Sequence, residues 1–208
     1  MGCSVVCVSH ATGSGGEEIG RQLAEKLGFV YVDEEIVARA AAAGGLAPED
    51  IAHEERRKSF ANRFLNVLAE NGGDAWTLST PGIATMEGAR PADVRDLIRE
   101  TVVQTAGHGN VVIVAHAASF AIDPGPRTLR VLVTASPAVR EKRIAASDGL
   151  DDAAAARTIK DSDASRRDYL KRFYSVDTES PIHYDLVVNT DHVSFEQGAE
   201  IVLRAAQR

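Results

Sequence analysis

The sequence predicts an α/β fold built on a parallel β-sheet. Short apolar runs alternate with helical patterns along the chain, which is typical of βα units. The runs are rich in Val and Ile with little polar alternation, as expected of strands that helices cover on both faces. With 208 residues, the chain has the length of one domain, or of one domain with an inserted lobe. It is long enough to bury a core without a metal or a disulfide.

Five runs are candidate strands, and segments of helical periodicity separate them. The strands are expected at Val5–Val8, Phe29–Val32, Val111–Ala115, Leu129–Val133 and Leu186–Val188. Apolar helix faces are marked by Ile19, Leu23 and Leu27, and then by Val94, Leu97, Ile98 and Val102. The last helix is expected from an N-cap at Ser194 to Arg208, with Ile201 and Leu203 closing the fold.

Three stretches depart from this alternation. Residues 46–72 are charged and helical, with apolar Phe60, Phe64, Val67 and Leu68, and residues 150–174 are Ala-rich and then dense in Arg and Asp. Both are interpreted as helical insertions at the carboxyl edge of the sheet. The Gly- and Thr-rich segment 71–91, with Trp76 and Pro81, is interpreted as a long loop that serves either as a lid element or as a contact in a homo-oligomer.

The composition limits the partners. The chain is 44% hydrophobic and carries 23 Lys and Arg against 30 Asp and Glu, a net charge of −7. This charge argues against nucleic acid or an anionic membrane as partner, and no apolar run approaches the roughly 20 residues of a membrane span. Cys3 and Cys7 would lie about 13 Å apart on a strand, too far for a disulfide. A reduced, cytoplasmic protein is expected.

A glycine loop, residues 9–16 (Ser-His-Ala-Thr-Gly-Ser-Gly-Gly), joins the first strand to the first helix. Converging backbone N–H groups and the positive end of the helix dipole make such a turn a phosphate cradle, at the sheet edge where open α/β folds bind ligands. A plain tight turn is the alternative, but three glycines in four residues exceed what a turn requires. The loop is therefore expected to bind phosphate.

The loop departs from the Walker A pattern G-x-x-x-x-G-K-[ST]. Gly16 and Glu17 occupy the positions of the lysine and of the hydroxyl residue, so neither the ammonium group nor the magnesium-binding hydroxyl is present there. Glu17 could complement the helix dipole, ligate a metal ion or repel a phosphate, and the sequence leaves all three open.

These residues, with others farther along, resemble the cytidylate kinase-like family. The matching segments are Ser9-His10, Gly13–Ala24, Asp33–Ile36, Val112–His116, Arg140–Ile144, Asp163–Arg166, Tyr169–Tyr174 and Asp185–Thr190. They cover nearly the whole chain apart from about 46–108. In this order, they are far more specific than the glycine loop alone.

The resemblance implies a three-layer P-loop kinase fold whose five-stranded parallel sheet has the order 2-3-1-4-5. One domain of 1–208 would then comprise a core (1–33, 91–144 and 181–208), an acceptor-binding lobe at about 34–72 and a lid at about 145–174. The implied activity is phosphoryl transfer from ATP, with Mg²⁺, to a nucleoside monophosphate such as CMP or dCMP. Catalysis of this kind depends on positioning and on cations that neutralise phosphate charge.

The resemblance also implies roles for individual residues. Catalytic cations are expected at Arg140, Arg143 and Arg166, with Asp163 and Arg167 as lid support. Phosphate or nucleotide contacts are expected at Ser9, His10, Thr12, Gly13, Ser14, Gly15, Gly16, Glu17 and His116. Acceptor contacts are expected at Asp33, Arg39 and Arg63. A solvated, salt-bridged helix is the alternative for the lid cations, because acidic residues are interleaved with them, and Asp33 could equally be a helix N-cap.

Two histidines stand where the family carries arginine. His10 follows Ser9, and His116 lies between Ala115 and Ala117. An ordinary imidazole pKa of about 6.5 leaves two interpretations: histidines that are charged when a phosphate is bound, or neutral loop histidines in a weakened site. The alternatives to an active kinase are therefore a nucleotide-binding sensor or regulatory partner of the same fold, and an enzyme acting on another phosphorylated small molecule.

Overall fold

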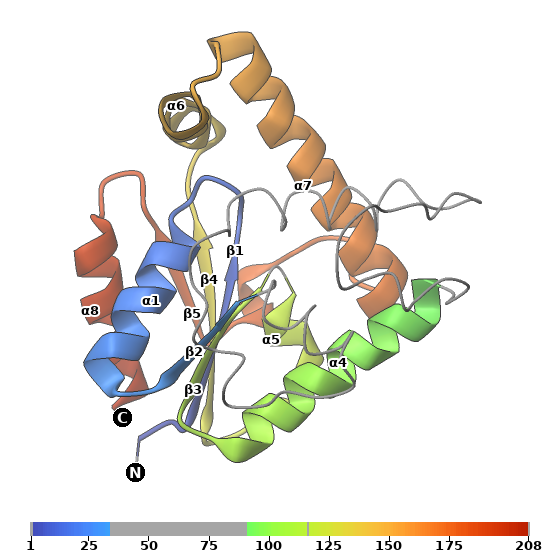
Figure 1. Cartoon of the computed structure of the whole chain (residues 1–208), viewed down its shortest axis with the longest axis vertical. Coiled ribbons are helices and arrows are strands. Elements are labelled where there is room, and N and C mark those ends of the chain that lie inside the picture. The colour runs from blue at the N-terminus through green and yellow to red at the C-terminus, as the bar shows by residue number, and fades with distance from the viewer. Residues whose placement is uncertain (1, 34–90, 116, 208) are drawn as a thin grey trace, which may run out of the picture.

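The computed structural model describes residues 2–33, 91–115 and 117–207, which form a three-layer α/β structure (Figure 1). Five parallel strands make one sheet in the order β2-β3-β1-β4-β5, so the expected fold class and strand order are confirmed. The strands are β1 (Val5–His10), β2 (Val30–Asp33), β3 (Val111–Val114), β4 (Thr128–Thr134) and β5 (Leu186–Asn189). All five coincide with the apolar runs.

The described helices lie between these strands in the chain. They are α1 (Gly16–Leu27), α4 (Pro91–His108), α5 (Ala118–Ala121), α6 (Pro137–Asp148), α7 (Asp152–Tyr174), a 3₁₀ turn η3 (Pro181–His183) and α8 (Phe195–Ala206). The acceptor-binding lobe expected at about 34–72 and the 71–91 loop fall outside the described residues, apart from Pro91 at the start of α4.

Alternate residues of the central strand pack against opposite helix layers. Val6 and Val8 of β1 belong to the core under α1 and α8, together with Ile19 and Leu23. Val5 and Cys7 belong to the other core, which Val102 of α4 and Ala118 of α5 cover. Because both faces are covered, all six residues of β1 are buried and the first four are apolar, which explains the missing polar alternation.

The last helix begins as expected but buries a different face. Ser194 caps α8 by accepting a hydrogen bond from the Gln197 N–H at 3.1 Å. Ile201 is 44% exposed, however, so the prediction that it helps to close the fold is wrong. The buried residues of α8 are Gly198, Ala199, Val202 and Ala206. Small side chains face inward here because α8 packs closely on α1, and a Cβ on Gly198 would lie only 2.8 Å from Ile19 Cδ1.

Both cysteines are buried free thiols, in agreement with the expected reduced state. Only Cys7 lies in a strand, because β1 begins at Val5. Burial raises the pKa of the Cys7 thiol to about 12, so it stays protonated and unreactive.

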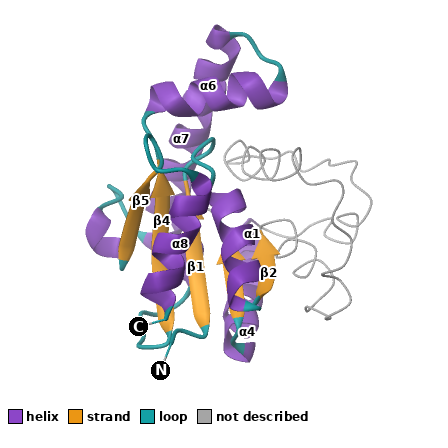
Figure 2. Ribbon diagram, turned by 90° about the vertical axis from the view of Figure 1, so that its left-hand side faces the viewer, coloured by secondary structure: helices purple, strands orange, loops and turns teal. Residues whose placement is uncertain are grey.

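Helices α6 and α7 stand above the carboxyl edge of the sheet (Figure 2). Helix α6 follows β4, and α7 begins after a short turn, where the Asp151 side chain accepts a hydrogen bond from the Ala154 N–H at 2.8 Å. The helical insertion expected at 150–174 is thus confirmed. In the ranges that the structure describes, no helix combines the length and the apolar character needed to span a membrane.

Candidate phosphate-binding site

The glycine loop is a tight turn fixed to the neighbouring strand. The Ala11 N–H donates to the Val133 carbonyl at 3.1 Å, and the Ser14 N–H closes the turn on the Ala11 carbonyl at 3.0 Å. The Ser14 hydroxyl also donates to the Val133 carbonyl, at 3.0 Å. These bonds place the loop at the carboxyl end of β1, beside β4, where α/β folds bind ligands.

Two glycines give the loop the backbone of an anion cradle. Gly13 and Gly15 have φ angles of 77° and 84°, whereas Ser14 between them is not left-handed. Alternation of left- and right-handed residues turns successive N–H groups toward one concavity, which binds anions. The first intrahelical bond joins the Ile19 N–H to the Gly15 carbonyl at 3.0 Å, so the earlier amides of α1 have no acceptor inside the helix. The loop can therefore offer N–H donors to phosphate.

Close packing accounts for Gly16 at the Walker lysine position. A Cβ on Gly16 would lie 2.2 Å from the Cβ of His10, which real atoms do not approach. His10 itself occupies the position of the first glycine in the Walker pattern. A side chain at residue 10 thus fills the space that a side chain at residue 16 would need. The loop has no lysine because its first glycine is a histidine.

Arg140 is a buried cation attached to this loop. Its Nη1 donates to the Thr12 carbonyl at 3.3 Å and its Nε to the Ala135 carbonyl at 3.1 Å. Two further bonds of 2.8 and 2.7 Å join it to both carboxylate oxygens of Asp163 on α7. The Arg140–Asp163 pair therefore connects α6, α7 and the loop.

Arg143 lies one helical turn farther along α6 and reaches the same loop. Its Nη1 donates to the Gly13 carbonyl at 3.3 Å and to the Thr190 hydroxyl at 2.9 Å, and its Nη2 donates to the Thr190 carbonyl at 2.6 Å. Thr190 is buried after β5 and donates its hydroxyl to the Ser14 carbonyl at 2.8 Å. The guanidinium carbon lies 4.9 Å from the ring centroid of Phe195.

Arg166 of α7 joins the lid to the end of β1. Its Nη1 donates to the His10 carbonyl at 3.2 Å. Its Nε and Nη2 donate to the Glu179 carboxylate at 3.0 and 2.5 Å, and Nη2 also donates to the Tyr184 hydroxyl at 3.4 Å. Tyr184 in turn donates to Glu179.

The pKa values of Glu179 and Tyr184 are shifted in opposite directions. Burial alone would raise the pKa of Glu179, but the hydrogen bonds and charge of Arg166 outweigh it and lower the pKa below its ordinary value. Burial and the adjacent Glu179 carboxylate raise the pKa of Tyr184 above its usual range. Glu179 is therefore ionised and Tyr184 protonated at neutral pH.

The remaining expected residues fall into four groups. The Ser9 and Thr12 hydroxyls bond to other side chains, Ser119 at 3.0 Å and Ser162 at 2.6 Å. Glu17 is exposed in the first turn of α1, where its charge complements the helix dipole, and Arg167 is exposed on α7. Asp33 ends β2, at the same sheet edge. Arg39, Arg63 and His116 lie outside the described residues.

Sequence reasoning missed three residues of the site: Glu179, Tyr184 and Phe195. Glu179 lies in an irregular segment and carries no pattern that indicates a partner. Tyr184 directly precedes the segment Asp185–Thr190, which resembles the family, and this position in the sequence could have indicated that Tyr184 lies near the site. Phe195 packs on the loop, since a Cβ on Gly15 would lie 2.2 Å from its ring.

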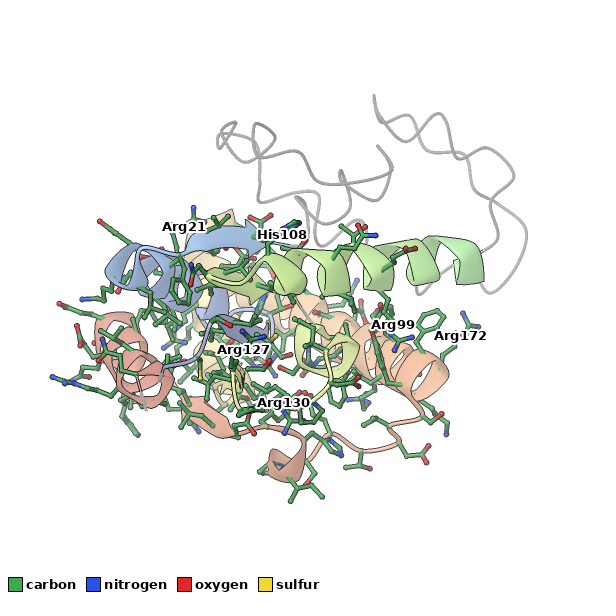
Figure 3. All side chains as sticks on the ribbon, turned by 90° about the horizontal axis from the view of Figure 1, so that it is seen from below. Arg21, Arg99, His108, Arg127, Arg130 and Arg172 are labelled. Carbon is green, nitrogen blue, oxygen red and sulfur yellow. The ribbon has the colours of Figure 1, made fainter. Side chains whose placement is uncertain are left out.

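A second cavity lies at the opposite edge of the sheet and is not part of this site. Its volume is about 630 Å³, and its lining includes Val5 and Thr128 at the amino ends of β1 and β4. Arg99, His108 and Arg127 also line it, on the side seen in Figure 3.

Comparison with known proteins places the chain among kinases. The sequence profile of the cytidylate kinase-like family matches residues 5–192. A cytidylate kinase from Ignicoccus hospitalis is 30% identical over 201 residues, which cover 97% of this chain and 98% of that protein. A cytidylate kinase from Aeropyrum pernix is 29% identical over 201 residues, with the same coverage.

Solved structures share the fold at low sequence identity. An uncharacterised protein from Eubacterium ventriosum superposes with a TM-score of 0.68 at 15% identity, covering 96% of both chains. Shikimate kinase from Bacteroides thetaiotaomicron gives a TM-score of 0.51 at 16% identity, again over 96% of both chains. These similarities support the fold of P-loop kinases.

Proposed function

Since the chain belongs to the cytidylate kinase-like family, we propose that it transfers the γ-phosphoryl group of ATP to a nucleoside monophosphate, with CMP or dCMP as the acceptor. Kinase chemistry is what the matched relatives share by name. The choice of CMP rests on those names, because no described side chain identifies the base.

The glycine loop carries this proposal. Its left-handed Gly13 and Gly15 and the open amides at the start of α1 suit the triphosphate of a nucleotide. In phosphoryl transfer the protein does little covalent chemistry. Catalysis depends mainly on hydrogen-bond donors fixed around the phosphates and on cations near them. Arg140, Arg143 and Arg166 bring three such cations to the loop.

The acceptor would approach from the β2 side of the loop. Asp33 ends β2 at this edge and is proposed to contact the acceptor, as are Arg39 and Arg63 beyond it. The segment of about 145–174, which holds the end of α6 and all of α7, is proposed to act as the lid that excludes water, so that water does not take the phosphoryl group.

Mg²⁺ is proposed as the metal, held mainly through the nucleotide. No cluster of three or more His, Cys, Asp or Glu side chains suited to a metal occurs in the described ranges. Mg²⁺ commonly keeps several waters and binds substrate phosphates through one or two protein carboxylates, so a preformed cage is not required. Glu17 and Asp33 are two of the described carboxylates at this sheet edge.

The test is ADP release from ATP and Mg²⁺ with a panel of monophosphates: CMP, dCMP, UMP, AMP and GMP. We expect turnover with CMP or dCMP that exceeds turnover with the other acceptors. If ATP raises the melting temperature but no acceptor gives ADP above background, the chain is a nucleotide-binding protein without kinase activity. If only another phosphorylated compound gives turnover, the chain is a kinase, but the proposed acceptor, CMP or dCMP, is wrong.

A further inference from the structure

The three arginines at the glycine loop differ in how their charge is balanced. Arg140 is paired with Asp163 at 2.7 Å, and Arg166 is paired with Glu179 at 2.5 Å. Arg143 bonds only to carbonyl and hydroxyl oxygens and faces the Phe195 ring; in the part of the chain that the structure describes, no carboxylate pairs with it. Of the three, only Arg143 adds a net positive charge to the loop.

The arginines reach the loop from its carbonyl side. In a trans peptide, the C=O of one residue and the N–H of the next point in opposite directions. Arg143 donates a hydrogen bond to the Gly13 carbonyl, and the Thr190 hydroxyl donates one to the Ser14 carbonyl. Arg143 also donates to that Thr190 hydroxyl. The Gly15 N–H, on the other side of the Ser14 peptide, therefore points away from Arg143. The Thr12 carbonyl, held by Arg140, fixes the Gly13 N–H in the same way.

A cation at the carbonyl oxygen also strengthens the donor at the other end of the peptide, because hydrogen bonds in a chain polarise one another. The loop lacks the lysine that would place an ammonium group on the ligand side, since His10 fills that space. The Arg143 charge can still attract a polyphosphate bound on the opposite side of the loop peptides. The distance is short and the site is partly buried, so solvent and salt screen this attraction only weakly.

Resting on the proposed function, we propose that Arg143, on the carbonyl side of the loop, takes over the role of the missing P-loop lysine. It supplies a positive charge that no carboxylate of the described residues balances. Through Thr190, it also orients the Gly15 amide toward the polyphosphate. Arg143 is thus a positioning residue that acts through the loop peptides. Arg140 and Arg166 are paired with the carboxylates of Asp163 and Glu179, so each pair has no net charge, and both arginines hold the loop by hydrogen bonds to its carbonyls.

The experiment compares Arg143→Gln, Arg143→Lys and the wild type by calorimetry with three probes: ATP, inorganic tripolyphosphate and adenosine. Arg130→Gln is the control, because Arg130, labelled in Figure 3, is bound to Asp185 near the amino end of β4, whereas the glycine loop lies at the carboxyl end of the sheet. Melting temperatures establish that each variant is folded.

We expect Arg143→Gln to weaken tripolyphosphate and ATP binding by about 10- to 100-fold, the size of one unbalanced charge at short range. Arg143→Lys keeps the charge but loses the paired bonds to Thr190, so it should bind tripolyphosphate and ATP more tightly than Arg143→Gln and less tightly than the wild type, and adenosine binding should not change. Arg130→Gln should bind all three probes as the wild type does.

Two results would overturn this inference alone: tripolyphosphate binding that Arg143→Gln leaves unchanged, or a loss that appears equally with adenosine, which would mean that Arg143 contacts the base. Equal losses in Arg143→Gln and Arg143→Lys would also overturn it, because charge would then not be the cause. If wild-type protein bound neither ATP nor tripolyphosphate, the proposed function would fail as well, so the two failures are distinguishable.

Discussion

The Cβ of His10 occupies the space into which a side chain on Gly16 would project, at 2.2 Å from the ideal Cβ position. The two residues stand at the first glycine and at the lysine of the Walker pattern. One substitution therefore requires the other: a side chain at residue 10 forces glycine at residue 16. The loss of the lysine is a packing consequence, and it leaves the backbone cradle intact.

The first prediction concerns this pair. Gly16→Ala should destabilise the fold by about 1–3 kcal/mol, the usual cost of overpacking, measured by urea unfolding. In the His10→Gly background the same change should cost at least about 1 kcal/mol less. Gly107→Ala, also in a helix but with open space around it, is the control and should be neutral or stabilising. Equal costs of Gly16→Ala in both backgrounds would mean that the two side chains do not compete.

The second prediction concerns the cradle itself. Gly15 and Gly28 both have left-handed φ angles, 84° and 66°, so alanine is strained at either position. Only Gly15 lies in the loop, and only there would a Cβ collide, with Phe195. Gly15→Ala should weaken ATP binding at least about tenfold, whereas Gly28→Ala should lower stability without changing ATP affinity. Calorimetric titration of both variants with ATP and Mg²⁺ checks this, and equal affinities would argue against the loop as the phosphate site.

The third prediction concerns pH. The folded-state pKa of Glu179 is lowered, so its ion pair with Arg166 stabilises the fold above the unfolded-state pKa, and this contribution is lost as pH falls through the lower folded-state value. Glu179→Gln removes that titration. The stability of the wild type should therefore fall more steeply with acid below about pH 5 than that of Glu179→Gln. Parallel curves of melting temperature against pH would show that the pair contributes nothing.

The fourth prediction concerns the Arg140–Asp163 pair. The Arg140 side chain is 5% exposed, so Asp163→Ala leaves a buried charge without its partner. We expect a loss of about 3 kcal/mol in the free energy of unfolding. Glu200→Ala, which breaks the exposed pair with Lys26, is the control and should leave the unfolding midpoint nearly unchanged. Similar effects of the two substitutions would contradict the structural role of Arg140.

Much of the architecture follows from local patterns. Parallel strands covered on both faces are mainly apolar, so the runs around Val6 and Ile113 could be located directly. The glycine loop could be recognised because glycine adopts the left-handed conformations of residues 13 and 15 at the least steric cost. The buried face of α8 could not be predicted from the sequence, because the small residues Gly198 and Ala199 pack inward on α1 while the larger Ile201 is exposed.

The partners of the charged residues were not predictable in the same way. The family resemblance placed Arg140, Arg143 and Arg166 near the phosphate site, but the atoms to which they donate depend on how α6 and α7 meet the loop. Glu179 is 13 residues from Arg166, in a segment with no periodic pattern, so no local signal connects the two. Their pairing comes from tertiary packing alone.

Amide resonances of the glycine loop provide the most direct measurement. In ¹⁵N-labelled protein titrated with Mg²⁺ and a non-hydrolysable ATP analogue, the account predicts that the Gly13 and Gly15 amides shift downfield at low ligand concentration, as N–H groups do when phosphate accepts their hydrogen bonds. Unmoved glycine amides, with saturable shifts confined to residues such as His108 and Arg127 around the cavity at the opposite edge, would contradict it.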